Sequence, residues 1–162
     1  MKDVLTEDYD YNLWVLLSQA NDVVFNAREE ELSQYGIPAM QARVLFLINS
    51  IGSETTPAQI SRWIFRKPHS VSGILFRMED AGLIKKTKDL HKKNLVRVTI
   101  TEKGQQIFEK SLKRKSVHKI MSVLTDEERQ QLQSIALKLR AKGLRDLRID
   151  PKKVPFPKFS QK

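Results

Sequence analysis

The chain of 162 residues contains no cysteine. This absence excludes disulfide bonds, thiolate metal sites, iron–sulfur clusters and thiol-based redox switches. The three histidines, His69, His91 and His118, include no pair four residues apart, so no two of them could bind a metal ion from one face of a helix. We therefore expect neither a metal ion nor another cofactor.

Long runs of apolar residues are absent as well. No window approaches the roughly 18 consecutive apolar residues that indicate a membrane-spanning helix. The first residues, MKDVLTEDYDYNLW, are acidic and do not follow the basic-then-apolar pattern of a signal peptide. These features predict a cytoplasmic protein that does not associate with membranes.

The sequence also lacks the motifs of common enzyme classes. It contains no G-x-x-x-x-G-K-[ST] or G-x-G-x-x-G pattern, the glycine-rich motifs that bind phosphates, and no G-x-S-x-G nucleophile motif. The adjacent carboxylates Glu79 and Asp80 would point to different faces of a helix, so they do not form an acid/base pair. The acidic run at residues 29–31 is interpreted as a solvated segment. We therefore predict that the protein is not an enzyme.

Positive charge is what the sequence has in excess, with a net charge of +10 at pH 7. Residues 1–54 carry 3 basic and 9 acidic side chains, residues 55–105 carry 11 and 4, and residues 106–162 carry 15 and 6. A basic region of this kind favours a polyanionic partner, with nucleic acid as the leading candidate. A well-solvated surface without such a partner is the alternative interpretation.

The first part of the chain predicts two helices. Residues 7–34 are apolar around much of the helix circumference, which fits a helix shared between a core and a subunit interface. An ordinary core helix is the alternative. Gly36 should end this helix. A second, buried helix should begin at Ile37 and Pro38, and residues 49–53 should break it.

Two short helices are predicted next. Thr56, Pro57 and Gln59 form a capping box that starts the first of them. Pro68 starts the second and Gly82 ends it. The inward face of this second helix should comprise Val71, Ile74, Leu75 and Met78.

Two strands should follow at residues 83–88 and 95–100, where apolar and polar residues alternate. The loop that connects them contains Lys92 and Lys93. A capped helix, a tight turn, a second helix and a strand–loop–strand hairpin with a basic tip are typical of a DNA-binding helix-turn-helix with a wing.

Such a unit places its second helix in the major groove of DNA. Small polar side chains near the start of this helix would contact base edges, and basic side chains would contact phosphates. Gly73 would allow a DNA strand to come close, although a tolerated glycine is an equal alternative. The predicted DNA-binding residues are Arg66, Lys67, His69, Ser70, Ser72, Gly73, Arg77, Lys92 and Lys93.

The C-terminal part predicts a helix from Thr101 to about Leu124 and a last helix that ends near Gly143 or a turn beyond. Thr125 and Glu128 form the capping box of the last helix. The proline-containing segment 151–162 should be extended or disordered. Two aromatic residues of the central unit, Trp63 and Phe65, are interpreted as core residues rather than as stacking platforms for bases.

Several short strings resemble the MarR family of winged-helix regulators. They are Gln41 with Arg43-Val44-Leu45, Ser70-Val71-Ser72, Arg77-Met78-Glu79, Gly82-Leu83-Ile84 and Thr101-Glu102-Lys103-Gly104, and they stand at the spacings of that family. The wing departs from the family pattern. There an Asp is closely followed by an Arg that enters the minor groove, whereas here Asp89 is followed by the tip residues Lys92, Lys93 and Asn94.

The resemblance implies a homodimer held by the N-terminal helix and the last two helices. It also implies recognition of a pseudo-palindromic operator by Ser70, Ser72 and the wing, and release by a small, often aromatic, ligand. An effector pocket near Trp14, Phe25, Met40 and Phe46 is one hypothesis, and plain core packing of these residues is the alternative.

We thus predict a mainly α-helical winged helix-turn-helix protein with a small β-hairpin wing and terminal dimerisation helices. Its parts would be an N-terminal dimerisation helix (1–36), a DNA-binding domain (37–104), C-terminal dimerisation helices (105–149) and a tail (150–162). Its function would be sequence-specific regulation of transcription, as a repressor that binds double-stranded DNA. Sequence-tolerant coating of DNA is the first alternative, and a protein-interaction module is the second.

Overall fold

The computed structural model describes residues 7–89 and 95–154. The elements in order are α1 (Tyr9–Ser33), α2 (Ala39–Ile51), α3 (Pro57–Trp63), α4 (Pro68–Asp80), β1 (Ile84–Lys88), β2 (Val96–Ile100), α5 (Glu102–Ser111), α6 (Lys115–Met121), α7 (Asp126–Asp146) and the 3-10 helix η1 (Pro151–Lys153). The predicted fold class, mainly helical with a small hairpin, is confirmed. None of the described helices combines the length and apolarity needed to cross a membrane.

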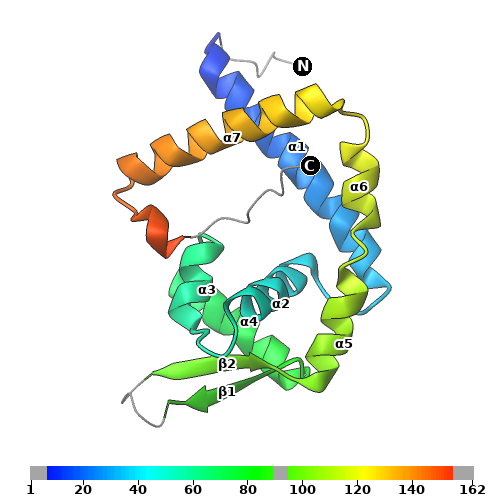
Figure 1. Ribbon diagram of the computed structural model, residues 1–162, viewed down its shortest axis with the longest axis vertical. Coiled ribbons are helices and arrows are strands. Elements are labelled where there is room, and N and C mark those ends of the chain that lie inside the picture. The colour runs from blue at the N-terminus through cyan, green and yellow to red at the C-terminus, as the bar shows by residue number, and fades with distance from the viewer. Residues whose placement is uncertain (1–6, 90–94, 155–162) are drawn as a thin grey trace.

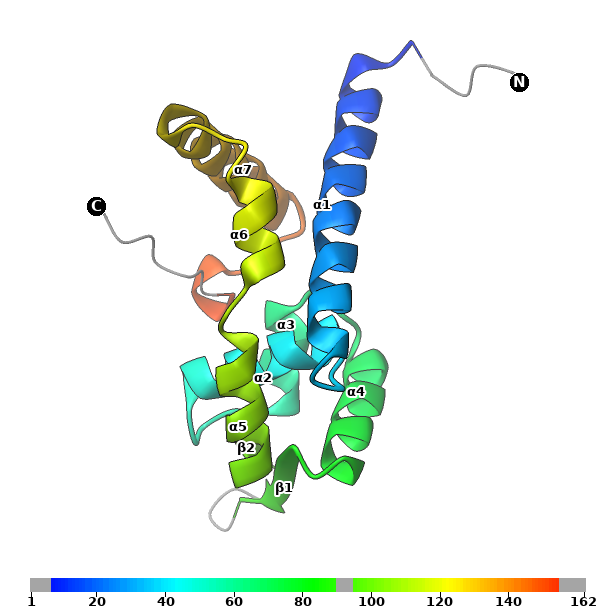
Figure 2. The same cartoon turned by 90° about the vertical axis from the view of Figure 1, so that its right-hand side faces the viewer.

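The molecule has two ends with different make-up (Figure 1). The winged unit of α2, α3, α4, β1 and β2 forms one end, and α5 flanks it. At the other end α6 packs against α1 and connects α7 back to α5, and α7, which overlaps α1 in Figure 1, stands apart from it in Figure 2. The N-terminal part of α1, α6 and α7 therefore lie away from the winged unit, whereas α5, most of which was assigned to the dimerisation helices, packs against α2 and β2.

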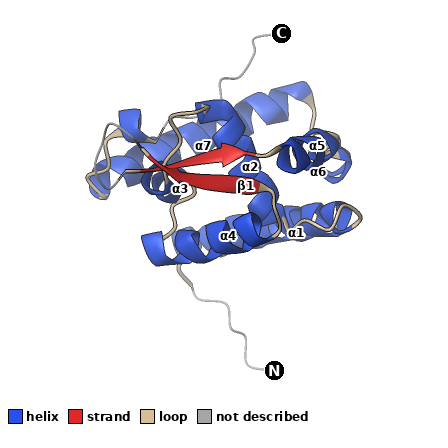
Figure 3. Ribbon diagram, turned by 90° about the horizontal axis from the view of Figure 1, so that it is seen from below, coloured by secondary structure: helices blue, strands red, loops and turns tan. Residues whose placement is uncertain are grey.

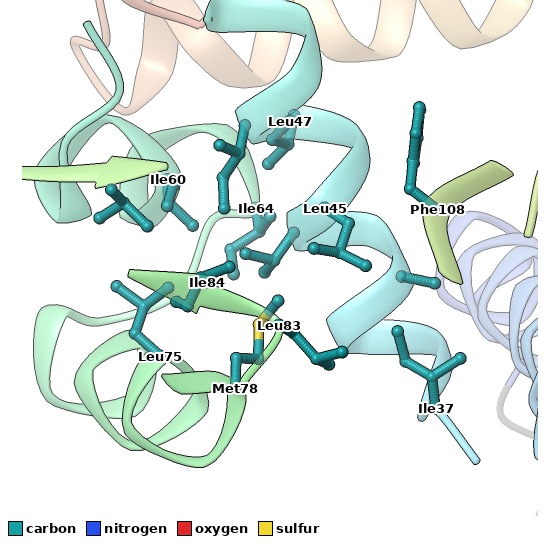
Figure 4. Packing of buried hydrophobic residues seen from close by; sticks show 14 of the residues in the cluster. Ile37, Leu45, Leu47, Ile60, Ile64, Leu75, Met78, Leu83, Ile84 and Phe108 are labelled. Carbon is teal, nitrogen blue, oxygen red and sulfur yellow. The ribbon is translucent and has the colours of Figure 1, made fainter. Parts of the chain in front are cut away.

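The core lies inside the winged unit. Side chains from α2, α3, α4 and β1 meet there, as Figure 4 shows. The largest fully buried side chains include Leu45, Ile60, Leu75 and Met78. Burying a side chain of this size stabilises the fold by about 1.5–3 kcal/mol. This core fixes the positions of α3 and α4 against the sheet.

The capping predictions are confirmed at the starts of α3 and α7. Thr56 and Gln59 form a reciprocal capping box, as do Thr125 and Glu128. The strands pair antiparallel with Ile84 opposite Ile100 and Lys88 opposite Val96. The helix predicted to begin at Ile37 and Pro38 and to break within residues 49–53 is α2. Pro38 is its N-cap residue, and the helix continues to Ile51 before Gly52.

The predicted continuous helix from Thr101 to Leu124 is wrong. The chain forms α5 and α6 instead, joined through Arg114 in the left-handed conformation (φ 48°). A continuous helix would pair the Lys115 amide with the Ser111 carbonyl. Here that carbonyl accepts a hydrogen bond from the Arg28 guanidinium, and the Lys115 amide donates to Glu31. Two side chains of α1 therefore replace the missing helical hydrogen bond.

The acidic run at residues 29–31 is not a solvated segment, so that interpretation is wrong for two of its members. The Glu29 carboxylate accepts a hydrogen bond from the Ala39 amide at the start of α2. Glu31 accepts hydrogen bonds from the Lys115 and Ser116 amides at the start of α6. Because helix N-termini carry unpaired amides and positive dipole ends, these carboxylates act as long-range helix caps.

Two further expectations differ from the structure. Phe65 is not a core residue: it lies in the turn between α3 and α4 with φ 53°, and 53% of its surface is exposed. Trp63 is partly buried against the core, as expected. The tail does not begin as an extended segment, because residues 151–153 form η1 and Val154 is buried. Its remaining residues, 155–162, lie outside the described residues.

Candidate functional site

The helix α4 buries one face and exposes the other. Val71, Leu75 and Met78 are almost fully buried, at 1%, 1% and 0% exposure. Most of the predicted DNA-binding residues on α4 are exposed on the other side: His69, Ser70, Ser72 and Arg77, with Gly73 half-buried between them. The structure therefore brings these residues together on one accessible surface, at the same end of the molecule as the hairpin (Figure 3).

A tight turn sets the angle between α3 and α4. The Ser61 hydroxyl donates to the Arg66 carbonyl at 2.5 Å, and the Arg66 amide donates to the Ser61 carbonyl at 3.1 Å. Lys67 is the N-cap residue of α4 and precedes Pro68, the first helical residue. The exposed side chains of Arg66 and Lys67 thus lie at the positive end of the helix, where an anion such as a phosphate is favoured.

The hairpin is held by an ion-pair network around Arg97. Its Nε lies 2.9 Å from Asp89 Oδ2, and its Nη2 lies 2.7 Å from Glu54 Oε2. Arg97 and Asp89 are 16% and 11% exposed, so this pair is shielded from water more than a surface pair. Asp89 therefore pairs with an arginine of β2. The predicted contact residues Lys92 and Lys93 lie outside the described residues.

A cavity of about 400 Å³ lies between α1, α2, α5 and α6. This volume is within the range of small-molecule sites. Its walls combine three aromatic rings with three guanidinium groups: Phe25, Phe46 and Phe108, and Arg28, Arg43 and Arg114. The Arg114 guanidinium lies 5.7 Å from the centre of the Phe46 ring, at cation–π distance. Such a lining suits an aromatic molecule that carries a negative charge.

Electrostatics inside the cavity favour an anion. Partial burial, and then the nearby positive charge of Arg66, lower the pKa of Arg43. The guanidinium group stays charged because its ordinary pKa is so high. The charge of Arg28 is partly balanced by Glu31, whose Oε2 lies 2.9 Å from Arg28 Nη1. Arg43 and Arg114 add positive charge to the lining, which favours an anionic ligand.

The structure places the four residues named for an effector pocket differently. Phe25 and Phe46 line the cavity, but Met40 packs against the core and Trp14 is 60% exposed on the N-terminal half of α1. The arginines of the cavity were not predicted, because Arg28, Arg43 and Arg114 come from three separate segments. One signal was available: Arg28 continues the apolar stripe of α1, and a charged residue on such a stripe needs a partner.

Both α1 and α7 expose many large apolar side chains. Of the 21 residues of α7, only Leu144 is buried. Large exposed apolar residues on the two helices are Tyr9, Tyr11, Leu13, Trp14, Leu16, Leu17, Val23, Leu132, Ile135, Leu137 and Leu139. Exposed apolar side chains in this number favour a site of protein association on these two helices.

Comparison with known proteins relates this geometry to a family. Residues 35–93 match the family model of the MarR family. No curated protein sequence matches the chain at a significant level. Two solved structures of the organohalide-sensing transcriptional regulator RdhR-CbdbA1625, one with 2,4-dichlorophenol bound and one free of ligand, share 30% identity with the chain. The match covers 99% of this chain and 98% of that protein, with a TM-score of 0.81.

More distant structures share the fold. A variant of MarR from E. coli in complex with operator DNA is 22% identical over 79% of this chain and 93% of that protein, with a TM-score of 0.75. MepR from S. aureus in complex with DNA is 20% identical over 85% of this chain and 99% of that protein, with a TM-score of 0.72. With the family match in the winged unit and the full-length relative, these likenesses establish that the chain belongs to the MarR family of winged-helix transcriptional regulators.

Proposed function

We propose that this MarR-family regulator binds a pseudo-palindromic operator as a homodimer and releases it when an aromatic anion binds between its two ends. The observation that carries the DNA part is the division of α4. One face is locked into the core by Val71, Leu75 and Met78. The exposed residues of the other include His69, Ser70, Ser72, Phe76, Arg77 and Asp80. A helix held in this way keeps a fixed orientation when it enters the major groove.

The assignment of contacts follows from chemistry. Arg66, Lys67 and Arg77 flank the exposed face of α4 and would contact phosphates, which position the protein. His69, Ser70 and Ser72 would approach base edges, which specify the sequence. The wing lysines, Lys92 and Lys93, would add charge at the adjacent minor groove or backbone.

The homodimer is supported by the apolar faces of α1 and α7, which the protomer leaves exposed. Burying these faces against a second copy would remove a large apolar area from water. A two-fold axis through this surface would place two copies of α4 about one DNA turn apart, roughly 34 Å. The operator should therefore contain two related half-sites at that spacing.

Ligand response is supported by the cavity lined by Phe46, Phe108 and Arg114. It lies where α1 and α6 meet the winged unit, so an occupant would contact both ends of the molecule. RdhR-CbdbA1625 was solved with 2,4-dichlorophenol, an aromatic molecule that can ionise. A phenol of this kind, in its anionic form, fits the rings and guanidinium groups of this cavity.

The test is selection of bound duplexes from a random pool, followed by competition and release assays. We expect a two-fold symmetric sequence that outcompetes random duplex, and we expect 2,4-dichlorophenol or a related phenol to release it. Equal affinity for the selected and random duplexes would favour sequence-tolerant coating of DNA instead. No binding to any duplex at low salt would refute the proposed function.

A further inference from the structure

An aromatic side chain lies on the exposed face of α4 without a role in the fold. Phe76 is 64% exposed, although the same helix buries Val71, Leu75 and Met78. A single exposed apolar residue needs no special explanation by itself. The position of Phe76 nevertheless needs an explanation, because Phe76 lies three residues after Gly73, four after Ser72 and seven after His69. At this spacing the four residues share one face of the helix.

The neighbour Gly73 makes this face unusually open. A glycine inside a helix costs about 1 kcal/mol relative to alanine. The fold does not require it, since an added Cβ would meet only Arg77 Nη1, at an ordinary distance of 3.7 Å. Because Gly73 carries no side chain, α4 could come closer to a base pair at this position, three residues before Phe76, than a helix with a larger residue there.

The chemistry of the major groove then limits what the ring can contact. Phenylalanine has no hydrogen-bond donor or acceptor, so it cannot read the polar pattern of a base pair. The one apolar group that the groove presents is the C5-methyl of thymine. We propose that Phe76 contacts the methyl group of a thymine in each half-site and is a specificity-determining residue for DNA recognition.

The helix geometry locates this thymine relative to the other contacts. Residues four apart on a helix are separated by about 6 Å along its axis. This is close to two base-pair steps of about 3.4 Å. With α4 lying along the groove, the thymine should be within about two base pairs of the base that Ser72 approaches. This inference rests on the proposed function, because it requires α4 to lie in the major groove.

The experiment replaces each thymine of the selected operator by deoxyuridine, one position at a time, which removes only the C5-methyl. The affinity of each duplex is measured for the wild-type protein, for Phe76→Ala and for the control Phe65→Ala. Phe65 is also an exposed aromatic residue, at 53%, but it lies in the turn before α4. Circular dichroism checks that all variants are folded.

We expect one thymine per half-site whose replacement weakens binding of the wild type and of Phe65→Ala about 3- to 10-fold. Phe76→Ala should bind the thymine and deoxyuridine duplexes with equal affinity. Wild-type protein that is insensitive to every replacement would overturn the assignment of Phe76 and leave the proposed function standing. So would a Phe76→Ala variant that keeps the discrimination. Failure to select any duplex would overturn both.

Discussion

Glu31 of α1 accepts hydrogen bonds from both the amide and the hydroxyl of Ser116, which lies 85 residues later in the chain at the start of α6. The same carboxylate accepts from the Lys115 amide and forms an ion pair with Arg28. One side chain of the first helix therefore holds the N-terminus of a helix that leads to α7. This contact joins α1 to α6 beside the cavity that Arg28 lines.

Replacing Glu31 should destabilise the protein and loosen α6. Glu31→Gln keeps the shape of the side chain but removes the charge that orders four donors, and hydrogen bonds to charged groups contribute about 1.5–3 kcal/mol. We expect the free energy of unfolding in urea to fall by about 1–3 kcal/mol. Glu30→Gln is the matched control, because Glu30 is the exposed neighbour. An equal loss in both variants would contradict the capping role of Glu31.

The stability of this contact should depend on pH in the acidic range. Burial alone raises the pKa of Glu31, but hydrogen bonds from Ser116, Lys115 and Arg28 outweigh it and lower the pKa from 4.5 to about 2. A carboxylate with a lowered folded-state pKa contributes stability that is complete above its unfolded pKa and is lost as the pH falls through the folded value.

We therefore expect the free energy of unfolding to decline between pH 4.5 and about 2, and to decline less steeply in Glu31→Gln. Hydrogen bonds from Lys86 lower the pKa of Glu79 as well. Glu79 contributes to the pH dependence of the wild type and of Glu31→Gln alike, so the difference between their two curves reports on Glu31. The measurement is urea unfolding at a series of pH values. Parallel curves for the two proteins would contradict this prediction.

Arg114 combines backbone strain with a contact in the cavity. Its left-handed conformation costs a residue other than glycine about 1 kcal/mol. Arg114→Gly should leave the free energy of unfolding unchanged or raise it by up to about 1 kcal/mol, because the strain is relieved while glycine also frees the unfolded chain. The same change should weaken binding of a phenolate ligand about 5-fold or more, since the guanidinium beside Phe46 is lost.

Calorimetric titration with 2,4-dichlorophenol, together with thermal unfolding, measures both effects of Arg114→Gly. Lys113→Gly is the control, because Lys113 is exposed and its φ is not positive. That variant should lose stability and keep its affinity for the phenol. Unchanged phenol affinity in Arg114→Gly would show that the guanidinium does not contact the ligand.

Two glycines should respond to alanine in opposite ways. Gly73→Ala should raise the free energy of unfolding by about 1 kcal/mol, because α4 has room for the methyl group. It should also weaken operator binding, since the added group separates α4 from the DNA. Gly104→Ala would place a Cβ 2.0 Å from the Leu83 carbonyl oxygen, so it should destabilise the fold by about 3 kcal/mol or more. A Gly73→Ala variant with undiminished operator affinity would argue against close approach there.

Two sets of variants should separate the contribution of base contacts to DNA specificity from the contribution of charge to DNA affinity. Ser72→Ala should reduce the preference for operator over random duplex several-fold, because the hydroxyl offers hydrogen bonds to a base edge. Lys92→Ala with Lys93→Ala should weaken all duplexes and lower the salt slope of binding by about 2. Fluorescence anisotropy at several salt concentrations measures both. If the lysine variant changed only the operator preference, the assignment of the wing to backbone contacts would be wrong.

Local patterns in the sequence determined most of the winged unit. The capping box at Thr56, the start at Pro68 and the apolar spacing of α4 depend on residues within a few positions of one another. Such short-range chemistry acts the same way wherever the segment lies in the fold. The division of α4 into a buried and an exposed face followed from this spacing alone.

Only the tertiary structure decided the break between α5 and α6 and the lining of the cavity. No glycine or proline marks the break at Arg114, and the residues there are compatible with a continuous helix. The helix ends because Arg28 and Glu31, on a helix far away in the sequence, bind the Ser111 carbonyl and the Lys115 amide. Hydrogen bonds between distant segments leave no periodic pattern in the sequence, so folding alone brings these groups together.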